Sequence, residues 1–499
     1  MVHHLPPELW THIALYLERD RSSLLNCARL CRQLQPVFER LLYRRVKVES
    51  EELYPKDGFI SLARFKALAN QMRQSLVRRM EYTVVIPYNI PDYQATKLEG
   101  YSEQNALRDA NNEAFQAGIS ALFEFLRTWK EDAKISLALE VQGRVRMPEP
   151  ETEANQNAKE WQGELRGERV VGPYRARFPS GGASMLTEVT CVDNLIVQYS
   201  YRSQGIATGA FLQIAERCAA LRRLHLDMPG QLRLDHVEYM RERREALASG
   251  LSRLPTTLQV FECVGRSEYP WSNTLPALDL RSANGIDELS SSLCLFSCKL
   301  RELRLSVVSV DMDFLFPLDE RGNPLPESSS LHWPRLETIA LDGVAEYTPS
   351  GEWLFDYELE SGDEEDFPDP ATGDEIFESR WLREEYETSR EKMNTEHFHR
   401  LFISLGVAAS PTNFTFTTST TTSGARGVIG DSYASTLSLP PGSRPLLKFR
   451  SNSAYMPDRR VADAWGFELD EMEIVDEGPR NDGHLVVCSV TLDQARLDR

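Results

Sequence analysis

The chain has 499 residues, which is too long for one ordinary compact core and predicts several domains or one elongated array. A net charge of -19 argues against binding to nucleic acid or anionic membranes, because their phosphate groups would repel it. The sequence has neither a signal-peptide pattern at its start nor a run of about eighteen apolar residues, so no membrane span is expected. Eight scattered cysteines are typical of reduced thiols and favour the cytoplasm or nucleus.

Residues 5–45 predict three short helices. Leu9, Ile13 and Leu17 recur every four residues and form one apolar stripe. Asp20 is a candidate N-cap residue for a second helix, and Pro36 marks the start of a third. A unit of this size has a marginal core and would gain from a partner that covers its spare apolar face.

An ordered motif runs through these helices. Its parts are Leu5-Pro6-x-Glu8-Leu9, then Ile13, Leu17, Asp20 and Leu24-Leu25, and finally Ala28-Arg-Leu-Cys31-Arg32. This resembles the F-box motif, except that Leu34 and Phe38 occupy the region where family members often carry Trp. The resemblance implies docking on a Skp-type adaptor and, through it, on a cullin. It implies adaptor-binding roles, shared with the unit's own core, for Leu5, Pro6, Leu9, Ile13, Leu24, Leu25 and Cys31.

The following segment alternates helices and strands. Residues 59–80 and 111–129 predict helices, residues 82–86 predict a strand that ends at Pro87, and residues 135–141 predict a half-buried strand. Residues 147–183 are polar and predict a long loop. The basic cluster of Arg40, Arg44, Arg45 and Lys47 is interpreted as a solvated helix end rather than a binding site.

A short pattern then recurs. It consists of an aliphatic residue, two residues of any type, a second apolar residue, one residue of any type, and finally an aliphatic residue or Cys. It begins at Leu186, Leu221, Leu258, Leu275, Leu300 and Leu336. This is the strand portion of a leucine-rich repeat, with the last two pattern positions pointing inward. The intervals of 35, 37, 17, 25 and 36 residues are irregular, and the shortest casts doubt on the Leu275 pattern. Helices expected at 209–220 and 236–249 support a solenoid, and the alternative is an ordinary α/β domain with leucine-rich strands.

The C-terminal third is more varied. Residues 358–375 are strongly acidic and predict a solvated loop, and residues 381–405 predict a helix. Residues 408–445 are low in complexity, with one candidate strand at 413–416 and little reason for 417–423 to pack. Closing strands are expected at 469–475 and 485–492, with Trp465 and Phe467 packed beneath them.

The predicted fold class is therefore mixed α/β: an N-terminal three-helix F-box followed by an irregular leucine-rich-repeat-like solenoid. The predicted divisions are residues 1–48, 49–183, 184–356 and 357–499. No phosphate loop, nucleophile elbow or zinc-protease motif occurs, so no enzyme activity, catalytic residue, cofactor or metal is expected. The cysteine pairs Cys27/Cys31 and Cys294/Cys298 are interpreted as small buried hydrophobic residues.

Together these features resemble a family of filamentous-fungal F-box proteins with divergent leucine-rich repeats, as do the stretches beginning at Trp333 and Thr348. The resemblance implies a substrate receptor of a ubiquitin ligase that binds a protein substrate through its repeats. A scaffold that mediates protein–protein interaction without ligase assembly is the alternative. The substrate stays open, as does phosphate recognition, for which the weak candidates are Arg222, Arg223, Arg301 and Arg304.

Overall fold

The computed structural model describes most of the chain up to residue 357 and shorter stretches beyond it. The described residues are 7–17, 20–30, 32, 34–52, 58–90, 105–130, 132–147, 174–179, 181–197, 204–228, 237–265, 277–282, 284–342, 345, 347–357, 390–409, 415–419, 447–451, 457–465, 469 and 484–488. Across these residues no helix is long and apolar enough to cross a membrane. The predicted acidic loop at 358–375 lies outside the described residues, as does most of the predicted loop at 147–183.

Three helices form an N-terminal helical unit (residues 7–44): α1 (Pro7–Tyr16), α2 (Arg21–Leu30) and α3 (Gln35–Arg44). Asp20 accepts a hydrogen bond from the backbone N–H of Ser23 and so caps the start of α2, as predicted. A small core holds the unit together, made of Ala14, Leu24, Phe38 and Leu42. Four buried side chains form a marginal core, so this unit is far less self-sufficient than the rest of the chain.

The remaining described residues form the sheet body (residues 45–488), which is built on one twelve-stranded sheet. Its strands are β1 (Arg45–Glu49), β2 (Phe59–Ser61), β3 (Arg79–Asn89), β4 (Ile135–Arg146), β6 (Val192–Val197), β8 (Arg223–Met228), β9 (Val260–Gly265), β10 (Glu302–Ser306), β11 (Thr338–Asp342), β14 (Thr415–Ser419), β15 (Leu447–Ser451) and β16 (His484–Cys488). From β3 to β16 each strand pairs with the next one along the chain. All pairs in the sheet are parallel except β15 with β16. The mixed α/β class with a parallel sheet is therefore confirmed.

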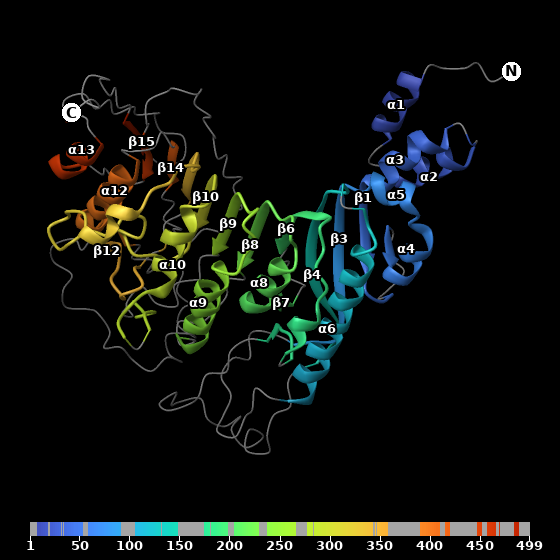
Figure 1. The fold of residues 1–499 in the computed structure, drawn as a ribbon, viewed down its shortest axis with the longest axis horizontal. Helices are drawn as coiled ribbons and strands as arrows, with labels where there is room; N and C mark the ends of the chain where they lie inside the picture. The colour runs from blue at the N-terminus through green and yellow to red at the C-terminus, as the bar shows by residue number, and fades with distance from the viewer. Residues whose placement is uncertain are drawn as a thin grey trace, which may run out of the picture.

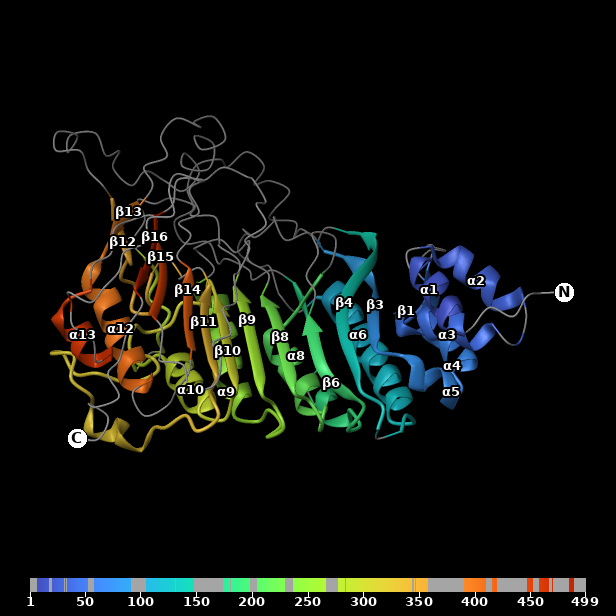
Figure 2. The same cartoon turned by 90° about the horizontal axis from the view of Figure 1, so that it is seen from above.

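Helices connect the strands and cover one face of the sheet (Figures 1 and 2). They are α4 (Leu62–Leu68), α5 (Gln71–Leu76), α6 (Ala106–Leu126), α8 (Thr208–Glu216), α9 (Val237–Leu251), α10 (Glu288–Ser297), α12 (Thr395–Ala409) and α13 (Arg459–Trp465). Crossovers between parallel strands have one hand, so strands that advance in a single direction place their connecting helices on a single face. The sheet runs without a break across the predicted divisions at 183 and 356.

Smaller elements complete the connections. Two short strand pairs lie apart from the main sheet, β5 (Arg175–Ala176) with β7 (Gly205–Ile206) and β12 (Phe355–Tyr357) with β13 (Arg390–Met393). Two single-turn 3₁₀ helices, η2 (Gly182–Met185) and η3 (Pro326–Ser330), lie between larger elements. The β5–β7 pair places Arg177, the residue after β5, beside the start of α8.

Apolar residues form continuous rows across the helix-covered face. One row, in direct register, contains Val46, Met80, Leu137, Leu195, Leu224, Phe261, Leu303 and Ile339. All of them are buried. Each such side chain contributes roughly 1.5–3 kcal/mol when it leaves water, so these rows supply much of the stability of the sheet body.

Four of the six sequence patterns coincide with strands of this sheet, those beginning at Leu221, Leu258, Leu300 and Leu336. Their last two positions are buried on the helix-covered face, as predicted, and their first residue is buried before the strand starts. The Leu275 pattern is wrong, because residues 277–282 contain no strand. The Leu186 pattern is shifted, because the strand is β6 and its apolar positions are Val192, Leu195 and Val197.

The segment from residue 59 to residue 89 differs from its prediction at both ends. Residues 59–80 are not one helix, since β2 precedes α4 and α5, and β3 begins at Arg79. The strand predicted to end at Pro87 continues to Asn89. There the Asn111 side chain of α6 accepts from the Tyr88 backbone N–H and donates to its carbonyl, each at 2.9 Å. This buried amide stabilises the end of β3 next to Pro87, which has no backbone N–H of its own.

The predicted helices at 111–129, 209–220 and 236–249 correspond to α6, α8 and α9. Asn105 caps α6 through hydrogen bonds from two backbone N–H groups, which explains its earlier start. The strand predicted at 135–141 is confirmed as β4, which continues to Arg146.

The C-terminal predictions hold less well. Residues 390–393 were expected in a helix but form β13, and α12 begins only at Thr395. Residues 417–419 were expected not to pack but belong to β14, where backbone pairing with β11 does not depend on apolar side chains. Trp465 is buried against α12, and its Nε1–H donates to the Phe402 carbonyl at 2.8 Å. Residues 470–475 and Phe467 lie outside the described residues.

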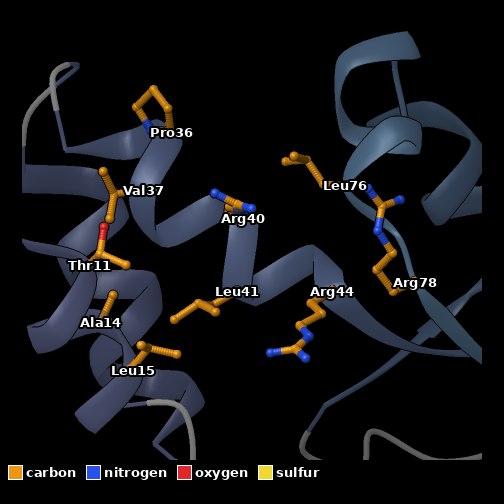
Figure 3. A pocket seen from close by; sticks show the side chains of 10 residues that line it. All are labelled: Thr11, Ala14, Leu15, Pro36, Val37, Arg40, Leu41, Arg44, Leu76 and Arg78. Atoms are coloured by element: carbon orange, nitrogen blue, oxygen red, sulfur yellow. The ribbon is translucent and has the colours of Figure 1, made fainter. Parts of the chain in front are cut away.

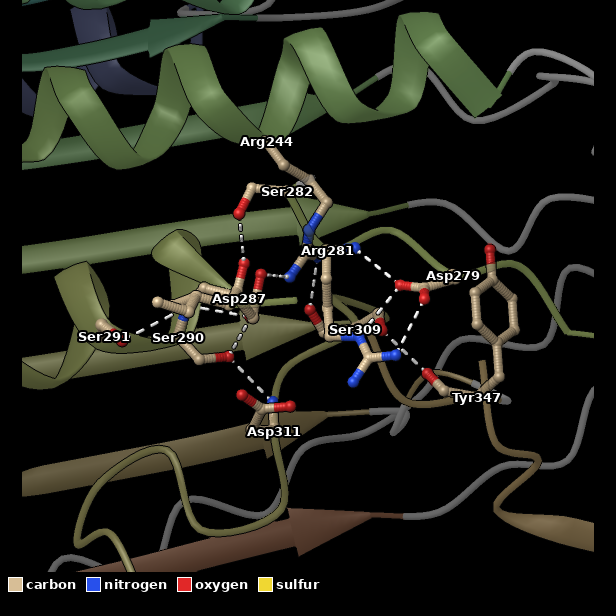
Figure 4. Close-up of polar contacts among 11 residues, drawn as sticks. Arg244, Asp279, Arg281, Ser282, Asp287, Ser290, Ser291, Ser309, Asp311 and Tyr347 are labelled. Atoms are coloured by element: carbon tan, nitrogen blue, oxygen red, sulfur yellow. Dashed lines mark hydrogen bonds and ion pairs between the residues drawn. The ribbon is translucent and has the colours of Figure 1, made fainter. Parts of the chain in front are cut away.

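A buried ionic cluster joins α9, α10 and the segment after β10 (Figure 4). Arg244 of α9 donates to the Asp287 carboxylate at 2.5 Å and to the Ser309 carbonyl at 2.6 Å. Asp287 also accepts from the Ser290 backbone N–H and so caps α10. Arg244 and Asp287 are both buried, so each compensates the desolvation of the other.

Candidate protein-interaction surfaces

Helix α1 exposes an unusual amount of apolar surface. Leu9, Ile13 and Tyr16 share one face of this helix and are 46%, 36% and 90% exposed. A neighbouring face of the helix points inward, where Ala14 is buried and Trp10 packs edge-on against Phe38 with ring centroids 6.5 Å apart. The α1 stripe (Leu9, Ile13 and Tyr16) is therefore left over after the unit has built its own core, which is typical of a binding surface.

Helix α2 divides the adjacent pair of leucines between core and surface. Leu24 is 2% exposed and belongs to the core of the unit, whereas Leu25 is 41% exposed. Of the residues singled out by the F-box resemblance, the structure thus leaves Leu9, Ile13 and Leu25 accessible and places Leu24 inside. Leu5, Pro6 and Cys31 lie outside the described residues.

Sequence reasoning missed three further exposed apolar residues of the unit, Leu15, Tyr16 and Leu30. A signal for Tyr16 was present, because it lies three residues after Ile13 and so continues the same helical face. The exposure of Leu15 and Leu30 depends on how the three helices pack, and spacing along the chain does not fix that.

A cavity of about 650 Å³ lies between the helical unit and the edge of the sheet body (Figure 3). Leu15 of α1 and Leu41 of α3 contribute apolar surface, while Arg40, Arg44 and Arg78 contribute positive charge. We call this the arginine groove. Because no carboxylate lines the groove among the described residues, it favours an acidic segment that also carries apolar side chains.

The helical unit is firmly mounted on the sheet. Helix α3 ends at Arg44 and β1 begins at Arg45, so no loop intervenes. Arg73 of α5 donates to Glu39 of α3 at 2.9 Å, and its guanidinium lies 5.3 Å from the centre of the Tyr43 ring. The direction of the α1 stripe relative to the sheet is therefore fixed.

The basic cluster predicted to be a solvated helix end is divided by the structure. Arg40 and Arg44 line the arginine groove. Arg45, Lys47 and Arg79 instead surround the single carboxylate of Glu81, with Arg79 at 3.1 Å and Lys47 at 3.8 Å. Arg45 and Lys47 therefore share a carboxylate on the sheet, whereas Arg40 and Arg44 line the groove.

The sheet face opposite the helices is polar in its middle strands. His225 of β8 lies 2.9 Å from Glu262 of β9, directly across the strand pair. The hydrogen bond from His225, helped by the charge of Arg304, holds the pKa of Glu262 below its usual value. This half-exposed row carries both signs of charge and offers a partner hydrogen bonds rather than apolar contact.

Two of the four arginines considered for phosphate recognition are already paired with carboxylates. Arg301 donates to both carboxylate oxygens of Glu337, at 2.7 and 2.8 Å. Arg304 pairs with Glu302 on its own strand. Since both guanidiniums already bind carboxylates, the strand face is poorly arranged to take a phosphate there.

Several cysteine thiols of the sheet body are buried. Burial raises the pKa of the Cys191, Cys263 and Cys294 thiols to about 12, so they are protonated at neutral pH. Cys294 is buried, as interpreted from the sequence, and its Sγ lies 3.1 Å from the Leu315 carbonyl oxygen. Cys27 and Cys298 are only partly buried, which differs from that interpretation, and Cys31 lies outside the described residues. No group of three or more metal-ligating side chains occurs within the described ranges.

No protein-family model matches the chain, and no curated protein matches it.

Proposed function

We propose that this protein is the substrate-receptor subunit of a Skp–cullin–F-box ubiquitin ligase. The observation that carries the proposal is the α1 stripe: a small helical unit exposes Leu9 and Ile13 after its own core is complete. These are two of the positions for which the F-box resemblance implies adaptor contact. Their exposure supports adaptor docking because burying both would remove a large apolar area from water.

The sheet body supports the second half of the proposal, the presentation of a protein substrate. From β3 onward its strands advance in chain order with helices on one face, as expected for a leucine-rich-repeat-like solenoid. Such an array presents a long strand face, and here its middle rows carry paired charges such as His225 and Glu262. We propose this face as the substrate surface.

A receptor of this kind needs no catalytic group of its own. It would accelerate ubiquitin transfer by holding the substrate close to the charged conjugating enzyme, which raises the effective concentration. Its place of action would be the cytoplasm, the nucleus or both, where adaptor and cullin operate.

Co-purification of the full-length chain from cells tests the proposal. The wild-type chain is expected to bring down both the adaptor and the cullin. The double variant Leu9→Asp/Ile13→Asp is expected to lose both, because each aspartate would have to be buried unpaired in the interface. The matched control is Leu295→Asp, which changes a leucine of α10 that is 63% exposed but lies in the sheet body.

Two outcomes would count against the proposal. Unchanged adaptor capture by Leu9→Asp/Ile13→Asp would exclude the α1 stripe as the docking surface. Adaptor capture without any cullin would favour the scaffold instead of the ligase receptor. Point variants are preferable to removal of residues 1–48, because that deletion also takes away buried Val46 and Val48 of β1.

A further inference from the structure

The arginine groove lies on the side of α1 that adaptor docking does not use (Figure 3). Thr11, Ala14 and Leu15 line it, and with about 3.6 residues per turn they lie on the face of α1 opposite the α1 stripe. Its volume of about 650 Å³ is within the range of about 300–1,000 Å³ that ligand pockets usually have, so several side chains of a bound segment would fit. A partner in the groove and an adaptor on the stripe would therefore approach α1 from opposite sides.

Both walls of the groove are held in place by contacts within the chain. The Arg78 backbone N–H donates to the Arg44 carbonyl at 3.0 Å, which joins the end of α3 to the residue before β3. A second link runs from Arg73 of α5 to Glu39 of α3. The groove is thus formed before a partner arrives, which reduces the entropy that is lost on binding.

The lining of the groove carries positive charge without a carboxylate among the described residues, although the net charge of the whole chain is -19. The Arg78 guanidinium donates to the carbonyls of Ser75 and Val77, at 3.0 and 3.1 Å, and these carbonyls do not neutralise its charge. Arg40 is exposed, and its guanidinium has no ion pair or hydrogen bond within the described part of the chain. Carboxylates of a partner would complement both guanidiniums.

The spacing of the lining residues on α3 indicates which kind of segment fits. Arg40 and Arg44 lie one helical turn apart in one row, and Val37 and Leu41 form a neighbouring apolar row. Leu15 of α1 extends the apolar surface. A segment that follows α3 would meet charge along one side and apolar surface along the other. The matching pattern is carboxylates one helical turn apart, with aliphatic side chains beside them.

We propose that the arginine groove binds an acidic amphipathic segment of the protein substrate, whose carboxylates bind Arg40 and Arg78 and whose aliphatic side chains pack against Leu15 and Leu41. This rests on the proposed receptor function, since it names the kind of substrate segment that the receptor holds. The substrate is favoured over the adaptor because the α1 stripe, which is proposed for the adaptor, faces away from the groove. Charge complementarity selects acidic partners, and the apolar contacts slow their dissociation.

Fluorescence polarisation of a labelled synthetic peptide with the full-length chain tests the groove. The probe repeats Glu-Leu-Leu-Ala, which places its glutamates one helical turn apart, and the matched peptide has Gln in place of every Glu. Wild-type protein is expected to bind the acidic peptide saturably and the Gln peptide about fivefold more weakly, because ion pairs to exposed arginines are lost. Added salt should remove most of that difference, because it screens exposed charges.

Variants of the groove test which residues bind the peptide. Arg40→Gln/Arg78→Gln is expected to weaken binding about fivefold and Leu15→Ser about threefold, through lost ion pairs and lost apolar contact. The control Arg64→Gln/Arg253→Gln removes the same charge from exposed arginines outside the groove and should bind as wild type. Equal affinity of the groove variant and this control would overturn the proposal, and so would the absence of saturable binding to wild type.

Variants are compared only if their melting temperatures match that of the wild type. Arg40→Gln alone changes an exposed side chain of α3 and should still weaken binding about twofold, so it decides the matter if the double variant is unstable.

Two other occupants of the groove would give different results. Displacement of the peptide by purified adaptor would assign the groove to the adaptor. A wild-type dimer that Arg40→Gln/Arg78→Gln abolishes, measured by analytical ultracentrifugation, would assign it to a second copy of the chain. Either result would overturn the assignment to the substrate.

Adaptor capture separates failure of the groove from failure of the proposed ligase function. Arg40→Gln/Arg78→Gln should capture the adaptor as wild type does. If wild type captures adaptor and cullin but does not bind the peptide, only the groove proposal is wrong. If wild type binds the peptide but captures no adaptor, the ligase proposal is wrong and the groove remains a site for an acidic segment.

Discussion

The helical unit and the sheet body use apolar residues in opposite ways. In the sheet body, rows such as Leu224, Phe261 and Leu303 run from strand to strand and are buried beneath the helices. In the helical unit a core of four residues is complete while Leu9 and Ile13 stay exposed. The comparison shows that exposed apolar surface in this protein is concentrated where the local core is smallest, which is where a partner would contribute most to stability.

The largest expected effect removes the core of the helical unit. Phe38→Ala should cost about 3–5 kcal/mol, as usual for truncation of a buried Phe, and this exceeds what so small a unit can supply. Hydrogen exchange should then show loss of protection in residues 7–44 with protection retained in the sheet body. Loss of protection throughout the chain would mean that the two regions fold as one cooperative unit.

The next effect concerns the ionic cluster of the sheet body. Arg244→Met leaves the Asp287 carboxylate buried without its cation and should lower the free energy of unfolding by about 3–5 kcal/mol. Urea denaturation measures the change, with Arg253→Gln as the exposed-arginine control. A loss below about 1 kcal/mol would show that water replaces the guanidinium in the cluster.

A smaller, pH-dependent effect is expected at Asp311. Burial, together with the charges of Asp287 and Asp313, raises the pKa of Asp311 to about 6, although Arg244 and Arg281 oppose the shift. The folded chain thus holds this proton more tightly than the unfolded chain. Its stabilising contribution is present below the ordinary pKa of 3.8 and is lost as the pH rises through about 6.

The variant Asp311→Asn tests the predicted direction in which the stability changes with pH. The variant should be about 1–3 kcal/mol more stable than wild type at pH 8, because it removes a partly buried negative charge that lies near Asp287 and Asp313. The difference should disappear at pH 4, where both side chains are neutral in the folded protein. Chemical denaturation at the two pH values gives the comparison, and an equal effect at both would exclude the titration of Asp311 as its cause.

The smallest effect on stability is expected at the α1 stripe. Leu9→Asp/Ile13→Asp should change the free energy of unfolding by no more than about 0.5 kcal/mol per site, since both side chains already face solvent. The same variant is expected to abolish adaptor capture. A large loss of stability would show that these residues belong to the core of the unit and would remove the contrast between the two regions.

Much of the fold could be predicted from short patterns. The three N-terminal helices, α8, α9 and four strands of the sheet follow from helical spacing and from the recurring leucine pattern. The pattern failed at Leu275 because apolar spacing without a neighbouring strand does not make a strand. It was misplaced at Leu186 because the matching triplet, ending in Val197, begins six residues later.

The candidate surfaces were less accessible to sequence reasoning. The motif selected Leu24 and Leu25 together, yet only the packing of α2 against α3 decides that Leu24 is buried and Leu25 exposed. The arginine groove joins Leu15 and Arg78, residues brought together from separate elements.

Most of the local elements can be predicted from the chain alone, since periodicity and capping act over a few neighbouring residues. It also determined the α/β class and the F-box resemblance. The packing of distant segments determines which apolar residues remain for a partner and which arginines pair with carboxylates, such as Arg301 with Glu337. Burial and ion pairing depend on contacts between distant segments, and spacing along the chain does not encode those contacts directly.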